Sequence, residues 1–283
     1  LVSSITMIHP VIRVQIENSV YDRLVAESVK YAIISLPYTF NRMKIKDYKS
    51  RILNIAKGKI SESIFFYFCE QNEIPVNTRK CQTPFYIPDK RDFILGREEW
   101  DIKNLFLVHK SPILSTDEYL NLPALIPSRG DWDQWSKKDN CIHAPETESV
   151  CYLFSFMKGW EDGSPFLNIE LSEEQNIFLG NLIVETKKTD IPYTEKWFWS
   201  KMAEKGQGNH FKFDLKFHPE LILCGIAQEK DFIKFIDLMP QSFQNNIFKT
   251  RIKNRGIELK HLSSFVSLYP HLEEKINCGK ILN

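Results

Sequence analysis

Apolar residues in the first seventy positions recur mainly at intervals of three and four. Residues 17 to 36 carry this pattern and predict an amphipathic helix that ends before Pro37. Residues 44 to 58 predict a second helix that stops at Gly58. Ser61 is the expected N-cap of a third helix that runs to Gln71. The region 1–57 is therefore expected to be mainly helical.

The pattern changes to alternation and short apolar runs after Ile74. Residues 81 to 108 are rich in β-branched and aromatic side chains and predict paired strands, and further strands are predicted at 149–158 and 211–226. The proline- and tryptophan-containing segment 111–148 is expected to be a surface excursion from a core of 58–236. The basic region 237–283 is expected to be helical. This order predicts a single α/β domain over 1–283, with a mixed central β-sheet flanked by helices.

The composition indicates a globular protein with a hydrophobic core and no dominant charge. The chain has 283 residues, of which 43% are hydrophobic and 13% aromatic, enough to bury a core. Its 37 basic and 36 acidic residues leave a formal net charge of +1. Any binding of nucleic acid must therefore come from local clusters of basic residues.

The six cysteines show no CxxC pair and no regular spacing, which favours reduced thiols in a cytoplasmic protein. Cys141, His143 and Cys151 come nearest to a zinc cluster, but they lack a fourth ligand at a usual spacing. Neither a secretion signal nor a membrane-spanning segment is indicated.

The stretch RDFILGREEWDIKN, residues 91 to 104, predicts a hairpin that carries chemistry. Successive strand residues point to opposite faces, so Asp101 and Lys103 share one face. Asp92 opens the partner strand, and residues 96–99 form the expected turn, which lets its carboxylate approach the same place. Two carboxylates beside an ammonium suit phosphodiester hydrolysis, because carboxylate oxygens hold Mg²⁺ and a cation can position or activate water.

The same residues have purely structural interpretations. Asp101 and Lys103 could form an ion pair on a solvated strand face. Glu62 would lie in the first turn of its helix, where the exposed amides favour any carboxylate. Glu98 and Glu99 are interpreted as turn or surface residues.

Asp92, a short turn and then Asp101-Ile102-Lys103 resemble the motif of the PD-(D/E)xK nuclease superfamily, which has the restriction-endonuclease-like fold. Members commonly have a helix with a glutamate before the hairpin, and Glu62 occupies that place. The resemblance implies a DNA endonuclease in which Asp92, Asp101 and Glu62 hold Mg²⁺, or Mn²⁺ in its place, while Lys103 assists the water. Asp89, which follows Pro88, is the alternative first acid. The match covers residues 58 to 104, about a sixth of the chain.

A chain of this length with no P-loop resembles standalone type II restriction endonucleases. That resemblance implies double-stranded DNA as substrate, a homodimer and a separate companion methyltransferase. Two alternatives stay open: a partner-dependent nuclease of transposition, repair or phage defence, and a non-catalytic nucleic-acid-binding module of the same fold.

Three segments are candidates for contact with nucleic acid. They combine basic side chains with each other or with aromatic rings that can stack on bases. The candidates are Lys249, Arg251, Lys253 and Arg255 near the C-terminus, Arg129, Trp132 and Trp135 in the excursion, and Arg79 and Lys80 near the hairpin.

Overall fold

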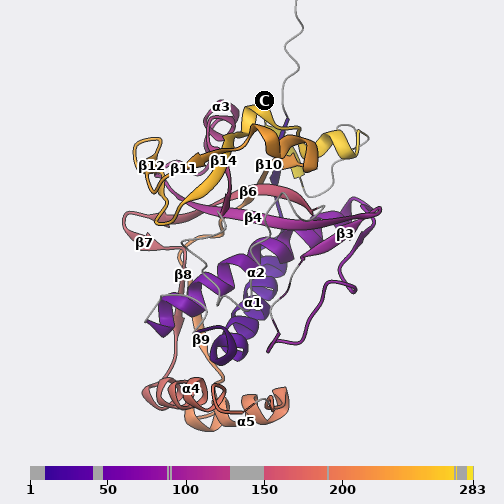
Figure 1. Ribbon diagram of the computed structural model, residues 1–283. Helices are drawn as coiled ribbons and strands as arrows, with labels where there is room; N and C mark the ends of the chain where they lie inside the picture. The colour runs from indigo at the N-terminus through magenta and orange to yellow at the C-terminus, as the bar shows by residue number, and fades with distance from the viewer. Residues whose placement is uncertain are drawn as a thin grey trace, which may run out of the picture.

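The computed structural model describes residues 10–40, 47–87, 89, 91–127, 150–189, 191–270, 272 and 279–282. Its centre is an eight-stranded mixed sheet, in which β4 and β6 are parallel and the other pairs antiparallel (Figure 1). The strand order is β15 (Gly279–Leu282), β1 (Val11–Val14), β10 (Leu221–Ala227), β6 (Val150–Glu161), β4 (Glu98–Val108), β3 (Phe93–Leu95) and β2 (Val76–Asn77), with β7 (Ser164–Pro165) pairing with β6. The predicted mixed α/β architecture is confirmed at this level.

Two long helices, α1 (Asn18–Thr39) and α2 (Tyr48–Gln71), cover one face of this sheet (Figure 1). The predicted end of α1 before Pro37 is wrong. Proline removes the amide that would donate to Ile33, which affects only the last turn. The end of the helix also accepts hydrogen bonds from Tyr193 at the carbonyl of Ile34 and from Thr186 at the carbonyl of Pro37.

The predicted break at Gly58 is also wrong, since α2 is one continuous helix. Its buried stripe of Ile52, Ala56, Ile60 and Ile64 repeats every four residues across the glycine. Asp47 caps the helix by accepting a hydrogen bond from the amide of Ser50 at 2.8 Å. The predicted end at Gln71 is confirmed.

A second layer of β-structure covers the opposite face of the central sheet. It contains a three-stranded sheet, β11 (Ile236–Leu238), β14 (Asn254–Glu258) and β5 (Pro123–Pro127), with the short helix α3 (Thr116–Leu120) beside it. A hairpin, β12 (Ser242–Phe243) and β13 (Phe248–Lys249), completes the layer. Short 3-10 helices span Glu229–Lys234, Leu259–His261 and Phe265–Leu268.

Two sequence predictions, for the C-terminal region and for the surface excursion, differ from the structure of this layer. The basic region 237–283 forms mainly strands and short 3-10 turns where it is described, because its segment Asn254–Glu258 pairs with β5 on one side and β11 on the other. The predicted surface excursion is wrong for its first part, since Leu122 to Ile126 are buried between the layers. The remainder, 128–148, lies outside the described residues.

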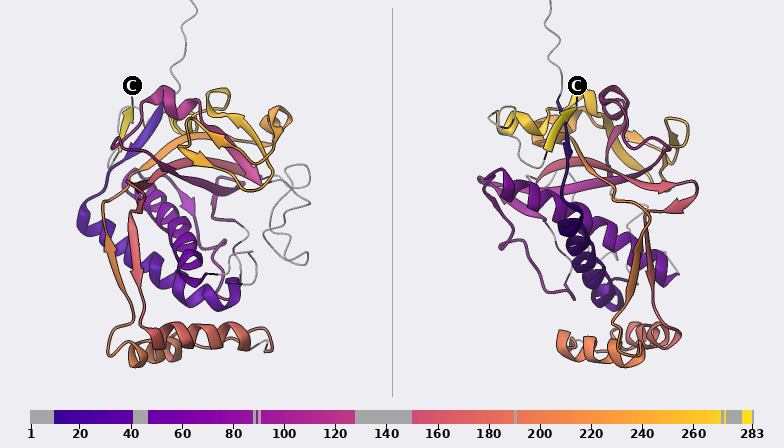
Figure 2. Two further views of the ribbon diagram at one scale, coloured as in Figure 1. Left: turned by 90° about the vertical axis from the view of Figure 1, so that its left-hand side faces the viewer. Right: turned by 180° about the vertical axis from the view of Figure 1, so that it is seen from behind.

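The strand predicted at 149–158 is confirmed as β6, whereas the segment 211–226 divides into two elements. Its second part is β10, and its first part is β9 (Lys212–Leu215), which pairs with β8 (Leu167–Glu170) outside the central sheet. The β8–β9 ribbon carries the helices α4 (Glu173–Glu185) and α5 (Glu195–Lys205) beyond α1 and α2 (Figure 2).

Candidate active site

The predicted hairpin forms, with a tighter turn than expected. Phe93, Ile94 and Leu95 pair with Trp100, Glu99 and Glu98, so Gly96 and Arg97 alone make the turn. Gly96 has φ +64°, a left-handed conformation that glycine adopts at little cost. Glu98 and Glu99 therefore belong to strand β4, and their exposed side chains agree with the surface role assigned to them.

The hairpin brings Asp92, Asp101 and Lys103 together. An Asp92 carboxylate oxygen accepts a hydrogen bond of 2.6 Å from the amide of Ile102, which lies between Asp101 and Lys103 in the sequence. The Lys103 ammonium contacts the Asp101 carboxylate at 2.5 Å. On the opposite face of β4, Trp100 is fully buried in the core. The alternation predicted for this strand is confirmed.

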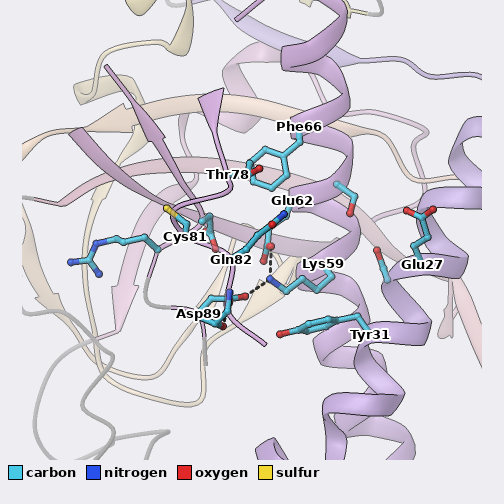
Figure 3. Close-up of a pocket in the computed structure, with 14 residues that line it drawn as sticks. Glu27, Tyr31, Lys59, Glu62, Phe66, Thr78, Cys81, Gln82 and Asp89 are labelled. Carbon is cyan, nitrogen blue, oxygen red and sulfur yellow. Dashed lines mark hydrogen bonds and ion pairs between the residues drawn. The ribbon is translucent and has the colours of Figure 1, made fainter. Parts of the chain in front are cut away.

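Glu62 reaches the site from the middle of α2. Its carboxylate forms an ion pair of 2.7 Å with Lys59, one turn earlier on the same helix face, and Lys59 also contacts Asp89 at 2.7 Å (Figure 3). Thr83 donates a hydrogen bond to Asp89 as well. Because α2 is continuous here, the interpretation of Glu62 as a first-turn carboxylate is wrong.

Lys59 was not predicted as a site residue. It lies three residues before Glu62, and that spacing places two side chains on one helix face. Because the sequence predicts a helix break at Gly58, Lys59 falls outside the predicted helix that carries Glu62. Lys59, Glu62, Asp89 and Asp92 all line a cavity of about 280 Å³ between α1, α2 and the segment before β3 (Figure 3).

The acidic groups repel one another. Burial raises the pKa of Asp92, and the charges of Glu62 and Asp101 raise it further, well above its usual range. Burial likewise raises the pKa of Glu62; Lys59 opposes this, while Asp89 and Asp101 add to it. These couplings place Glu62, Asp92 and Asp101 in one electrostatic cluster.

The two lysines remain charged. Burial acts to lower the pKa of Lys59, but Glu62 and Asp89 outweigh it and hold that pKa well above its usual range. Burial also acts to lower the pKa of Lys103, and the Asp101 carboxylate outweighs it in turn. Each ammonium therefore offsets part of the negative charge of the carboxylates beside it.

The chemistry of the donors fits a hard divalent cation, since carboxylate oxygens are the ligands that Mg²⁺ prefers. The positions of these carboxylates fit a metal less well than their chemistry does. Among the described residues, no group of three or more His, Cys, Asp or Glu side chains is arranged to hold a metal ion. Lys59 takes the place between Glu62 and Asp89 that a cation could otherwise share. The assignment of Glu62, Asp92 and Asp101 as metal ligands therefore stays a prediction.

A second cavity, of about 330 Å³, opens on the other side of Glu62 and contains Lys103. Lys249 and Arg251 line it, so the structure brings two of the predicted nucleic-acid contacts to the candidate site. Lys253 instead pairs with Asp237 at 2.6 Å, and Arg255 donates to the carbonyls of Phe232 and Phe235.

The other predicted contacts are not brought to this cavity. Arg79 and Lys80 are exposed next to Thr78 and Cys81, which line the cavity around Lys59. Arg129, Trp132 and Trp135 lie outside the described residues, as do Cys141 and His143.

The cysteines in the described part of the chain, Cys69, Cys81, Cys151 and Cys224, are free thiols. Burial raises the pKa of Cys151 to about 12, and Glu98 adds to that rise. None of the described helices combines the length and apolar character needed to span a membrane.

Comparison with known proteins adds no relative: no family model, no curated protein and no solved structure matches the chain.

Proposed function

We propose that this chain is a Mg²⁺-dependent endonuclease of the PD-(D/E)xK class that hydrolyses phosphodiester bonds in double-stranded DNA. The observation that carries the proposal is the hydrogen bond of 2.6 Å between Asp92 and the amide of Ile102. It holds one acid against the strand that carries Asp101 and Lys103, and Glu62 couples to both acids from α2.

The acidic residues and Lys103 would have different roles in this reaction. Asp92, Asp101 and Glu62 would hold the metal, and Mg²⁺ when bound supplies positive charge that offsets the charge developing on the phosphate. Lys103 stays protonated at neutral pH, because Asp101 raises its pKa. It can therefore donate hydrogen bonds to a phosphate oxygen or orient the attacking water.

The proposal is tested by incubating the purified protein with unmethylated plasmid and genomic DNA in Mg²⁺ or Mn²⁺. We expect Asp101→Ala and Lys103→Ala to lower the cleavage rate by about 10²-fold or more, since each removes charge at the reacting phosphate. Asp214→Asn is the matched control, because Asp214 is an exposed aspartate on strand β9, away from the site. Wild-type protein that is folded yet cuts neither DNA with either metal would overturn the standalone endonuclease.

The cleavage products distinguish a restriction enzyme from a partner-dependent nuclease. Discrete fragments would support a restriction enzyme that works as a homodimer with a companion methyltransferase. A smear, or cleavage only with an added partner, would support the partner-dependent nuclease of transposition, repair or phage defence.

A non-catalytic nucleic-acid-binding module is the second candidate. It is favoured by the two lysines that neutralise the acids in the absence of metal. Such a module would bind DNA equally with and without Mg²⁺ and would show no cleavage in Mn²⁺.

A further inference from the structure

The cavity beside Lys103 is lined by one acidic and three basic side chains. Glu62 and Lys103 line it together with Lys249 and Arg251, which come from the chain at and just after β13. Leu105, Leu125 and Phe248 add apolar side chains to the lining. Positive side chains of this kind attract the phosphates of a nucleic-acid backbone.

Lys249 and Arg251 are available for a ligand. Both side chains are exposed, and neither has an ion-pair partner among the residues that the structure describes. Lys249 ends strand β13 and Arg251 follows two residues later, and both side chains line the same cavity. The hydroxyl of Thr250 between them bonds Gln241, accepting from its amide at 3.0 Å and donating to its carbonyl at 3.2 Å.

The backbone that carries these two residues is firmly held. Phe243 and Phe248 stack across the β12–β13 hairpin with ring centroids 4.7 Å apart. The amide of Val108, at the end of β4, donates to the carbonyl of Ile247 at 2.7 Å. The β12–β13 hairpin is thereby hydrogen-bonded to β4, the strand that carries Asp101 and Lys103. Because this hairpin is already ordered, a ligand loses no binding free energy by ordering it.

We propose that Lys249 and Arg251 form a phosphate subsite that binds the DNA strand next to the phosphodiester bond to be cut. Lys253 and Arg255, from the same basic segment, do not belong to it, because Asp237 and two backbone carbonyls already hold them. This subsite rests on the proposed endonuclease function. It contacts phosphates only, and it therefore adds affinity without reading base sequence.

The test is the affinity of a fluorescent DNA duplex for the full chain, measured by anisotropy in EDTA over a range of salt concentrations. We expect the Lys249→Gln/Arg251→Gln double variant to bind at least about tenfold more weakly than the wild type at low salt. The slope of log K against log salt should become shallower by about 1.8, because each lost phosphate contact contributes about 0.9. Lys253→Gln, the matched control, should change the affinity less than about twofold, since that lysine faces Asp237.

The inference fails if the double variant keeps wild-type affinity and slope, if Lys253→Gln loses as much affinity, or if the wild type binds no DNA. A parallel cleavage assay in Mn²⁺ separates this failure from that of the proposed function. Unchanged affinity with active cleavage would overturn the subsite alone. Lost affinity in the double variant of a protein that never cuts would support phosphate binding by Lys249 and Arg251 and overturn the endonuclease. Thermal melting of each variant confirms that it is folded.

Discussion

Lys57 is a buried lysine of α2 whose surroundings disfavour its charged form. The residue is 4% exposed, its ammonium lies 3.4 Å from the Trp160 ring centroid, and it has no hydrogen-bond partner among the described residues. Burial lowers the pKa of Lys57 from 10.5 to about 7. Attraction to the ring favours the charged form and offsets about 1–2 kcal/mol of that penalty.

We therefore expect Lys57→Met to stabilise the protein in a pH-dependent way. The unfolded chain binds one more proton than the folded chain between pH 7 and 10.5, so the wild type gains stability as pH rises through this window. The variant should be more stable than the wild type by about 1–3 kcal/mol at pH 6, and this difference should shrink by pH 9.5. Chemical denaturation at both pH values measures it. Lys49→Met, at an exposed position of the same helix, is the control, and an equal gain at both pH values would contradict the account.

The sequence predicted the hairpin acids and Lys103 because alternation along a strand fixes which side chains share a face. It could not show that Lys59 bridges Glu62 and Asp89, since Asp89 comes from a segment thirty positions away in the chain. Nor could it show which basic residues already have partners. Lys249 and Lys253 look alike in the sequence, and only the pairing of β11 with β14 places Asp237 beside Lys253.

The continuity of α2 determines where Glu62 and Lys59 lie. Gly58 sits inside this helix, and a Cβ atom added there would meet nothing within 4 Å. We expect Gly58→Ala to stabilise the protein by about 0.5–1 kcal/mol, because alanine restricts the unfolded chain and favours helix.

The contrasting variant is Gly159→Ala in strand β6, where a Cβ would approach the Phe106 Cβ to 2.8 Å. It should lower the free energy of unfolding by about 1–3 kcal/mol through overpacking. Urea denaturation of both variants measures these effects. Destabilisation by Gly58→Ala would argue against a continuous helix at this position.

The helical and strand patterns identified most of the central elements, but local signals misplaced their ends. Gly58 and Pro37 both mark helix ends by their intrinsic preferences, yet burial against the sheet continues across each of them. The prediction of helix for the C-terminal basic segment is wrong. Pairing of β14 with β5 and β11 decides its structure, and such long-range pairing leaves little trace in a short window of sequence.

Across the molecule, the candidate site depends on contacts between distant parts of the chain. The central sheet joins β4 to β6 in parallel and places α2 on one side, while the β12–β13 hairpin reaches the end of β4 from the other. A net charge of +1 gives no overall attraction for DNA. The proposed affinity for DNA therefore depends on local basic groups, and Lys249 and Arg251 are two that the fold brings to the cavity beside Lys103.

The most direct test of the central claim compares two aspartates that both lie near Glu62. Nicking of supercoiled plasmid in Mg²⁺ is followed for the wild type, Asp92→Asn and Asp89→Asn. Asp92 is held against the Asp101–Lys103 strand, whereas Asp89 pairs with Lys59 and Thr83. We predict that Asp92→Asn loses about 10²-fold or more of the nicking rate, while Asp89→Asn stays within about tenfold of the wild type. Equal rates for Asp92→Asn and the wild type, or nicking that persists in EDTA, would contradict the account.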